Sequence, residues 1–133
     1  MRRPVLLIVG GGAVSRAAIG RATGLAGDAL VTVLGVGTEA PGDPGGELVR
    51  RAVAQAMSAL NSGYVMALGH ISVTGSPART IARMARARGA QAVVLDQMSG
   101  LAGGLAGELR RRLHGSGIAV VATAEPARQP GPA

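Results

Sequence analysis

GSPARTIARMARARGAQAVVLD, residues 75–96, decides the fold because it contains a turn, an amphipathic helix and a buried strand in one uninterrupted unit. Ser76 is placed to cap the helix, and Pro77 suits its first turn, where a missing N–H costs nothing. Gly89 ends the helix, and the apolar run at residues 92–95 predicts a strand covered on both faces. A helix followed by a buried strand is the repeating unit of a doubly wound parallel sheet, whose ligand sites lie at strand ends.

The predicted helix in this unit has two distinct sides. Residues at helical spacing form an apolar side that faces the core, and arginines occupy the opposite, solvated side. The apolar side consists of Ile81, Met84 and Ala85, and the solvated side of Arg79, Arg83 and Arg86.

Outside this unit, the chain keeps alternating short apolar runs with amphipathic segments. Such an alternation, joined by right-handed crossovers, predicts a three-layer α/β/α sandwich built on a five-stranded parallel sheet, a Rossmann-like fold. Strands are expected at residues 5–9, 30–36, 64–74, 92–95 and 118–122, helices at 16–26, 47–60, 77–88 and 105–114, and loops at 37–46 and 97–104.

The length of 133 residues predicts one domain. We place that domain at residues 1–123. The segment at residues 124–133 (AEPARQPGPA) is expected to be a disordered tail, since it is rich in proline and has no apolar pattern.

The charge is strongly basic, with a formal net charge of +7 from fourteen arginines against seven acids and no lysine. Guanidinium groups bind phosphate and carboxylate bidentately, so this composition suits anions. The arginines are nevertheless scattered along several predicted helices, which is typical of solvated faces. Tyr64 is the only aromatic residue, and this excludes the stacking platforms with which proteins read single-stranded nucleic acids.

The sequence predicts neither a disulfide scaffold nor a thiolate site, because it contains no cysteine. The apolar run after Arg3 is too short for a signal peptide core or a membrane span, so we expect a soluble cytoplasmic protein without a membrane contact. His70 and His114 stand apart from each other and from the acids, which predicts no metal site.

No catalytic residue is predicted, and we lean against an enzyme. The chain has no G-x-S-x-G elbow and no legible Ser-His-Asp set, and Ser15 and Ser76 are better explained as helix caps. The serines considered are Ser15, Ser76, Ser99 and Ser116.

The combined register of these segments resembles the universal stress protein family from about residue 4 to residue 122. Residues 9–19 (VGGGAVSRAAI) keep the frame of the family's opening strand, loop and serine-headed helix. Residues 75–78 (GSPA) and 88–95 (RGAQAVVL) are similar to its helix start and its following strand. Leu109, Leu113 and residues 118–121 match the closing helix and strand.

The resemblance implies a strand order of 3-2-1-4-5 and a homodimer joined through the last strand. In one branch of the family it also implies an adenine nucleotide, ATP or AMP, in the crevice between the first and fourth strands. That location agrees with the physics of the fold, because the strand order reverses there and helix N-termini offer N–H donors. The candidate ligand-binding residues are Gly10, Gly11, Gly12, Ser15, Val36, Asp96, Gly100, Gly103 and Gly107.

The phosphate-binding motif of the nucleotide-binding branch, G-x2-G-x9-G-[S/T], is incomplete here. Gly100 and Gly103 fit its first half, but Leu113 stands where the third glycine is expected. When the closing strands are aligned instead, Gly107 and Glu108 occupy the Gly-Ser position. A carboxylate there would repel a phosphate.

Two further exchanges alter the crevice. Asp96 replaces the family's glycine after the fourth strand, and Gly10 replaces its acid after the first strand. The loop is also about four residues shorter than in the family. The loop that would bind the phosphates is therefore shorter than in the family, and its acidic residues stand at different positions.

Three interpretations of the crevice follow. In the first, the chain holds no nucleotide and works through dimerisation or partner contact. In the second, it still holds an adenosine-type ligand, with Asp96 on the ribose hydroxyls. The third interpretation is a dinucleotide enzyme, because residues 10–14 resemble the start of precorrin-2 dehydrogenase. Against it, the last glycine of the dinucleotide-binding motif is replaced by Ser15, and no substrate domain is predicted. The leading functional hypothesis is a regulatory or stress-response binding module with an altered nucleotide crevice. A structural dimerisation domain and a weak nucleotide hydrolase are the alternatives.

Overall fold

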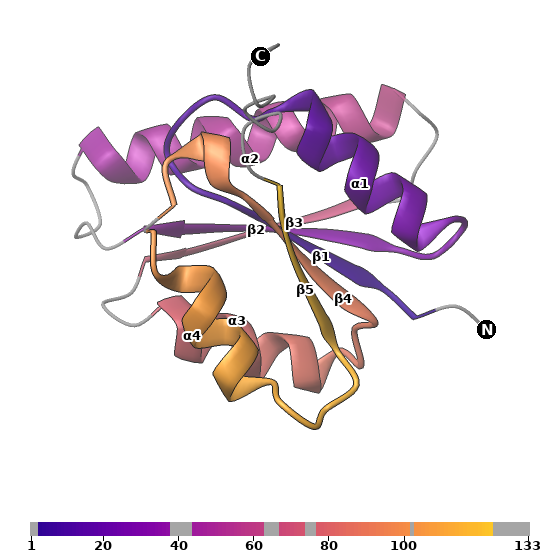
Figure 1. Ribbon diagram of the computed structural model, residues 1–133. Coiled ribbons are helices and arrows are strands. Elements are labelled where there is room, and N and C mark those ends of the chain that lie inside the picture. The colour runs from indigo at the N-terminus through magenta and orange to yellow at the C-terminus, as the bar shows by residue number, and fades with distance from the viewer. Residues whose placement is uncertain (1–2, 38–43, 63–66, 74–76, 102, 124–133) are drawn as a thin grey trace, which may run out of the picture.

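The computed structural model describes residues 3–37, 44–62, 67–73, 77–101 and 103–123. Five strands alternate with four α-helices and one short 3-10 helix, η1, in these ranges (Figure 1). The strands are β1 (Val5–Val9), β2 (Val31–Gly37), β3 (Ala67–Val73), β4 (Ala92–Asp96) and β5 (Ala119–Thr123). The helices are α1 (Arg16–Ala26), α2 (Pro44–Ser62), α3 (Pro77–Ala87), η1 (Gln97–Ser99) and α4 (Leu105–Arg112).

The strands form a single parallel sheet in the order β3-β2-β1-β4-β5. All residues of β1 and β4 are buried, because these two central strands are covered on both faces. The predicted α/β architecture with a parallel sheet is therefore confirmed.

Helices cover both faces of the sheet, which completes the three layers (Figure 1). On one face, the alanines of α1 and the apolar side of α2 pack against the odd-numbered residues of β1, among them Leu7. On the other face, α3 and α4 pack against Leu6 and Ile8. The alternation along β1 therefore divides the core into two clusters, one under each pair of helices.

The register of the sheet fixes where its functional edge lies. Ile8 pairs with Leu95, so that the residues following β1 and those ending β4 stand at the same level. The order of the strands reverses at this point, since β1 has β2 on one side and β4 on the other. The turn after β1 and the turn after β4 must consequently meet at one edge.

Several predicted bounds need correction. The helix α2 begins at Pro44 inside the expected loop, because a proline is well accommodated in the first turn of a helix. The expected loop after β4 contains η1, whose first turn is capped by the carboxylate of Asp96. The helix α4 ends at Arg112, two residues earlier than expected.

Some predictions fall outside the described residues. The predicted cap Ser76 and the tail at residues 124–133 are among them, so the division into a domain at 1–123 and a disordered tail stays a prediction.

Candidate functional site

The turn after β1 and the turn after β4 lie in direct contact at the carboxyl edge of the sheet. The backbone N–H of Gly12 donates to the carbonyl oxygen of Ser99, with an N···O distance of 2.6 Å. The backbone N–H of Gly10 donates to Ser99 Oγ at 2.8 Å. The two glycine-bearing turns predicted to meet are therefore joined to each other through one serine.

Ser99 connects the two turns because its hydroxyl group bonds in both directions. While Oγ accepts from Gly10, it donates to the backbone carbonyl of Asp96 at 2.7 Å. The residue is fully buried. The sequence did not predict that Ser99 connects the two turns. The Asp-x-x-Ser spacing at the end of a strand is nevertheless typical of a capped turn.

The glycines of the first turn are required by how closely the turns approach. A Cβ atom added at Gly10 would lie 2.7 Å from the carbonyl oxygen of Ser99, and one at Gly12 would lie 3.0 Å from the same oxygen. A side chain or ligand group placed between the turns would therefore have to push the two turns apart.

The carboxylate of Asp96 is fully buried and is directed at the start of α1. Its Oδ2 accepts from the backbone N–H of Ser15 at 2.8 Å, and its Oδ1 accepts from Ser15 Oγ at 3.0 Å and from Met98 N at 3.1 Å. Both oxygens are thus satisfied by protein donors. Because Asp96 is fully buried, a ribose hydroxyl could reach its carboxylate only if the surrounding residues moved, and the assignment of Asp96 to a ribose stays a prediction.

The N-terminus of α1 is occupied by the protein itself. Ser15 caps the helix as predicted, because its Oγ accepts from the backbone N–H of Ala18 at 3.2 Å. The carboxylate of Asp96 adds the negative charge that a helix N-terminus favours. In a doubly wound fold this end of the helix is where an anionic ligand commonly binds, and here an internal anion stands there.

Of the remaining candidate residues, some lie beside this contact and others do not. Gly100 follows Ser99 with a left-handed φ of 88°, and its Cβ position would be 3.7 Å from the backbone nitrogen of Gly12. Val36, near the end of β2, is buried with α3 and α4. Gly103 is exposed, and Gly107 lies within α4, facing Arg111 rather than the turns. The structure therefore brings Gly10, Gly12, Ser15, Asp96 and Gly100 together and leaves Gly103 and Gly107 apart.

The side chain of Glu108 pairs with a residue of its own helix, α4. Its carboxylate pairs with Arg112 Nε on the next turn of α4, at 3.0 Å. The pair is exposed and of the i, i+4 type, so its contribution to stability is small.

The described residues contain no group of three or more histidine, aspartate or glutamate side chains that could hold a metal ion. Nor does any described helix have the length and apolarity that crossing a membrane requires.

Comparison with solved structures agrees with the observed fold. A universal stress protein from Archaeoglobus fulgidus superposes with a TM-score of 0.68 at 16% identity, over 92% of this chain and 93% of the other. A protein of that family from Burkholderia pseudomallei gives 0.65 at 21% identity, over 93% and 97%. The chain has the universal stress protein fold.

A further structure with this fold is a universal stress protein in complex with cAMP, at a TM-score of 0.63 and 20% identity over 92% of this chain and 96% of the other. At the level of sequence, no protein-family model matches the chain, and no curated protein does.

The edge of the sheet at β5 is the second candidate site. Ala119 donates its backbone N–H to Gln91, beside β4, so the N–H and C=O groups of Val120 and Ala122 point away from β4. The carbonyl of Val120 accepts from Arg110 Nη2 at 3.3 Å. The side chains of β5 are exposed at Ala119 and only partly buried at the other four residues.

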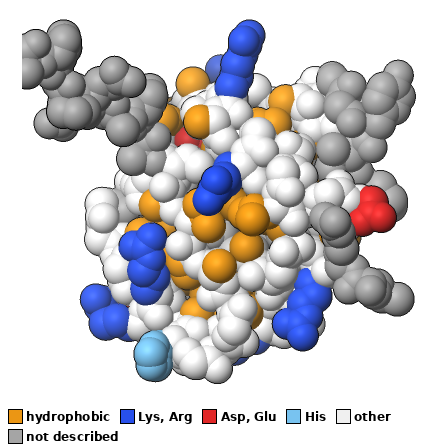
Figure 2. All heavy atoms as spheres, turned by 45° about the vertical axis from the view of Figure 1, so that its right-hand side comes forward, with side chains coloured by type: hydrophobic (Ala, Val, Ile, Leu, Met, Phe, Trp, Pro, Cys, Tyr) orange, Lys and Arg blue, Asp and Glu red, His pale blue; other side chains and the backbone are white. Residues whose placement is uncertain are grey.

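In Figure 1, β5 lies at the front of the sheet, and this side still faces the viewer in Figure 2. Figure 2 shows hydrophobic side chains gathered there in a patch, with arginine side chains around it. An exposed strand edge with an apolar surround is suited to association with another chain.

Proposed function

We propose that this chain is a universal stress protein-like regulatory module that acts in the cytoplasm as a homodimer, through contacts with a second copy and a partner. In this proposal the crevice between β1 and β4 is altered so far that it holds no adenine nucleotide. The fold supports the module, and the contact between the two turns supports the altered crevice.

The observation that carries the proposal is the buried carboxylate of Asp96. It takes the place at the N-terminus of α1 that an anionic ligand would otherwise use, and its three donors come from Ser15 and Met98. A phosphate brought to the same place would meet a like charge at short range, with little water to screen it. The Ser99 bridge adds a steric obstacle, since a ligand must also separate the two turns.

Adenine nucleotide binding is the second candidate, and the cAMP complex of a protein with this fold favours it. Under this alternative, ATP or AMP would bind near Val36 and Gly11, and the turns would open to admit the ribose. A weak nucleotide hydrolase is a variant of the same idea. It requires phosphate release above the buffer rate, and the release should disappear in Asp96→Ala.

Calorimetry with adenosine and cAMP tests the proposal, because these ligands carry the base and ribose with at most one phosphate. We expect no saturable heat up to millimolar concentration. Saturable binding in the micromolar range, with the backbone amide signals of Gly10 and Gly12 shifted in NMR spectra, would overturn the proposed function and favour the nucleotide alternative.

The homodimer is tested by Ala122→Pro. The N–H of Ala122 points away from β4, so proline removes a donor to a second copy and leaves the pairing with β4 intact. Light scattering should give twice the mass of one chain for the wild type and for the control Ala122→Val, and the mass of one chain for Ala122→Pro. A monomeric wild type would refute the dimer.

A further inference from the structure

A groove of about 520 Å³ runs between α3 and α4, on the opposite face of the sheet from α1 and α2. Of the five described residues that line it, four are arginines and the fifth is a small, buried alanine. The lining residues are Arg79, Ala82, Arg83, Arg86 and Arg112. The groove is therefore an open surface depression lined by cationic side chains, with Ala82 as its apolar floor.

The positive charge of the groove is mostly uncompensated. Seven of the fourteen arginines of the chain lie within residues 77–112, where the only acids are Asp96, which is buried elsewhere, and Glu108. Glu108 pairs with Arg112. Within the part of the chain that the structure describes, neither Arg79 nor Arg83 has an ion-pair or hydrogen-bond partner.

The spacing of these arginines works against the stability of α3. Arg79 and Arg83 are four residues apart, and Arg83 and Arg86 three, so like charges face each other along one side of the helix. Such pairs destabilise a helix slightly. An anion between them would remove this repulsion.

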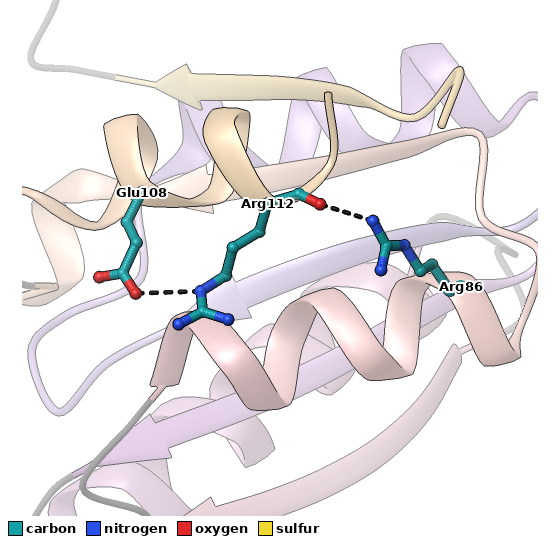
Figure 3. A network of polar contacts seen from close by, with 3 residues as sticks. All are labelled: Arg86, Glu108 and Arg112. Atoms are coloured by element: carbon teal, nitrogen blue, oxygen red, sulfur yellow. Dashed lines mark hydrogen bonds and ion pairs between the residues drawn. The ribbon is translucent and has the colours of Figure 1, made fainter. Parts of the chain in front are cut away.

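One arginine is held in place across the groove. Arg86 Nη2 donates to the backbone carbonyl of Arg112 at the C-terminus of α4, at 2.5 Å (Figure 3). The side chain of Arg112 is held in turn by Glu108, as the second dashed line in Figure 3 shows. Two guanidinium groups, one from each helix, are thus positioned before any ligand arrives, which lowers the entropy cost of binding.

We propose that this arginine groove, defined by Arg79, Arg83, Arg86 and Arg112, is a binding site for a small molecule that carries a chain of two or more phosphate groups. Guanidinium groups bind phosphate oxygens bidentately. Arg79 and Arg86 are about 10 Å apart along the axis of α3. This length allows several linked phosphates to be contacted at once, whereas a single phosphate reaches only part of the set.

The size and lining of the arginine groove favour a small ligand over a macromolecule. Its volume lies within the range of small-molecule sites, about 300 to 1,000 Å³. None of the described residues that line it is aromatic, so they offer no platform for stacking the bases of a nucleic acid.

Isothermal titration calorimetry with inorganic tripolyphosphate at low ionic strength tests the site directly. The test variant is R79Q/R83Q, which removes the two unpaired arginines. The control is R50Q/R51Q on α2, which removes the same charge from another exposed helix, where both arginines face Glu47. Both pairs are on the surface, and circular dichroism verifies that each variant is folded.

We expect R79Q/R83Q to weaken tripolyphosphate binding about tenfold or more, because charge-assisted hydrogen bonds are lost, while R50Q/R51Q stays within about twofold of the wild type. Orthophosphate should bind the wild type at least about tenfold more weakly than tripolyphosphate.

Three results would overturn the proposal. Equal weakening in both variants would mean that only net charge matters. Absence of saturable tripolyphosphate binding to the wild type would mean that the groove is not a site. Tighter binding of a hexaglutamate peptide or of single-stranded RNA than of tripolyphosphate would assign the groove to a macromolecule. None of these results bears on the crevice at β1 and β4, so the two proposals fail separately.

Discussion

The carboxyl edge of the sheet and the arginine groove differ in whether their charged side chains are buried and hydrogen-bonded. At the edge between β1 and β4, the carboxylate of Asp96 is buried and accepts three hydrogen bonds from its own chain. In the arginine groove, Arg79 and Arg83 are exposed and lack partners among the described residues. The first region is closed and satisfied, and the second is open and unsatisfied.

This difference shows that the position of a ligand site in a fold does not guarantee its use. The strand order makes the edge at β1 and β4 the expected crevice. Here Ser99 and Asp96 fill it with hydrogen bonds that stabilise the chain itself. Residual binding capacity is found instead where polar groups remain unpaired, which is between α3 and α4.

The largest effect is expected from Asp96→Ala. It leaves the N–H and hydroxyl of Ser15 and the N–H of Met98 without their buried acceptor. Each donor left unpaired costs about 1 to 3 kcal/mol, so the free energy of unfolding should fall by about 4 kcal/mol. Urea denaturation followed by circular dichroism measures it. The control Glu108→Ala removes a half-exposed carboxylate and should cost less than about 1 kcal/mol. Equal losses would mean that the edge is not a specific network.

A steric test of the same region is Gly10→Ala. The new Cβ would lie 2.7 Å from a backbone oxygen that cannot rotate away, which should destabilise the protein by about 2 kcal/mol. Gly103→Ala is the control, because a Cβ there meets nothing within 4 Å. Thermal unfolding of both variants gives the comparison, and an unchanged midpoint for Gly10→Ala would show that the turns are not in contact.

Removing the bridge itself should have a smaller effect. Ser99→Ala leaves the N–H of Gly10 without its acceptor, and we expect a loss of about 1.5 kcal/mol. Thr23→Ala, which removes an exposed hydroxyl on α1, is the control and should stay within about 0.5 kcal/mol of the wild type. If urea denaturation gives the same result for both variants, the bridge does not hold the turns together.

The arginine groove should respond in the opposite sense. R79Q/R83Q removes like-charge repulsion along α3 without breaking a contact, so stability should rise by about 0.3 kcal/mol at low salt. The gain should vanish at high salt, because exposed charges are screened. Thermal unfolding at two salt concentrations measures the difference, and a loss of stability would reveal a structural role for these arginines.

The sequence was sufficient for the layers and for the meeting of the glycine turns, since these follow from the periodicity of short segments. The apolar run at residues 92–95 and the serine cap at Ser15 are examples in which local chemistry determined the structure. The start of α2 was not predicted. The proline and glycine content of residues 37–46 indicated a loop, although a proline is also favoured in the first turn of a helix.

The interactions within the candidate site could not be predicted in the same way. The partners of Asp96 are Ser15, 81 residues earlier, and Met98, and only the folded chain shows that they satisfy both oxygens. The arginine groove was also missed as a site. Its arginines come from two helices separated by β4, and each helix alone has the pattern of a solvated face.

An NMR titration of the wild type with ATP tests the contrast between the two regions most directly, because ATP carries both an adenosine and a triphosphate. We predict chemical shift changes at Arg79, Arg83, Arg86 and Arg112, with the amide signals of Gly10 and Gly12 unmoved. Shifts at the two glycines with none on α3 and α4 would contradict it, and would show that the edge of the sheet remains a nucleotide site.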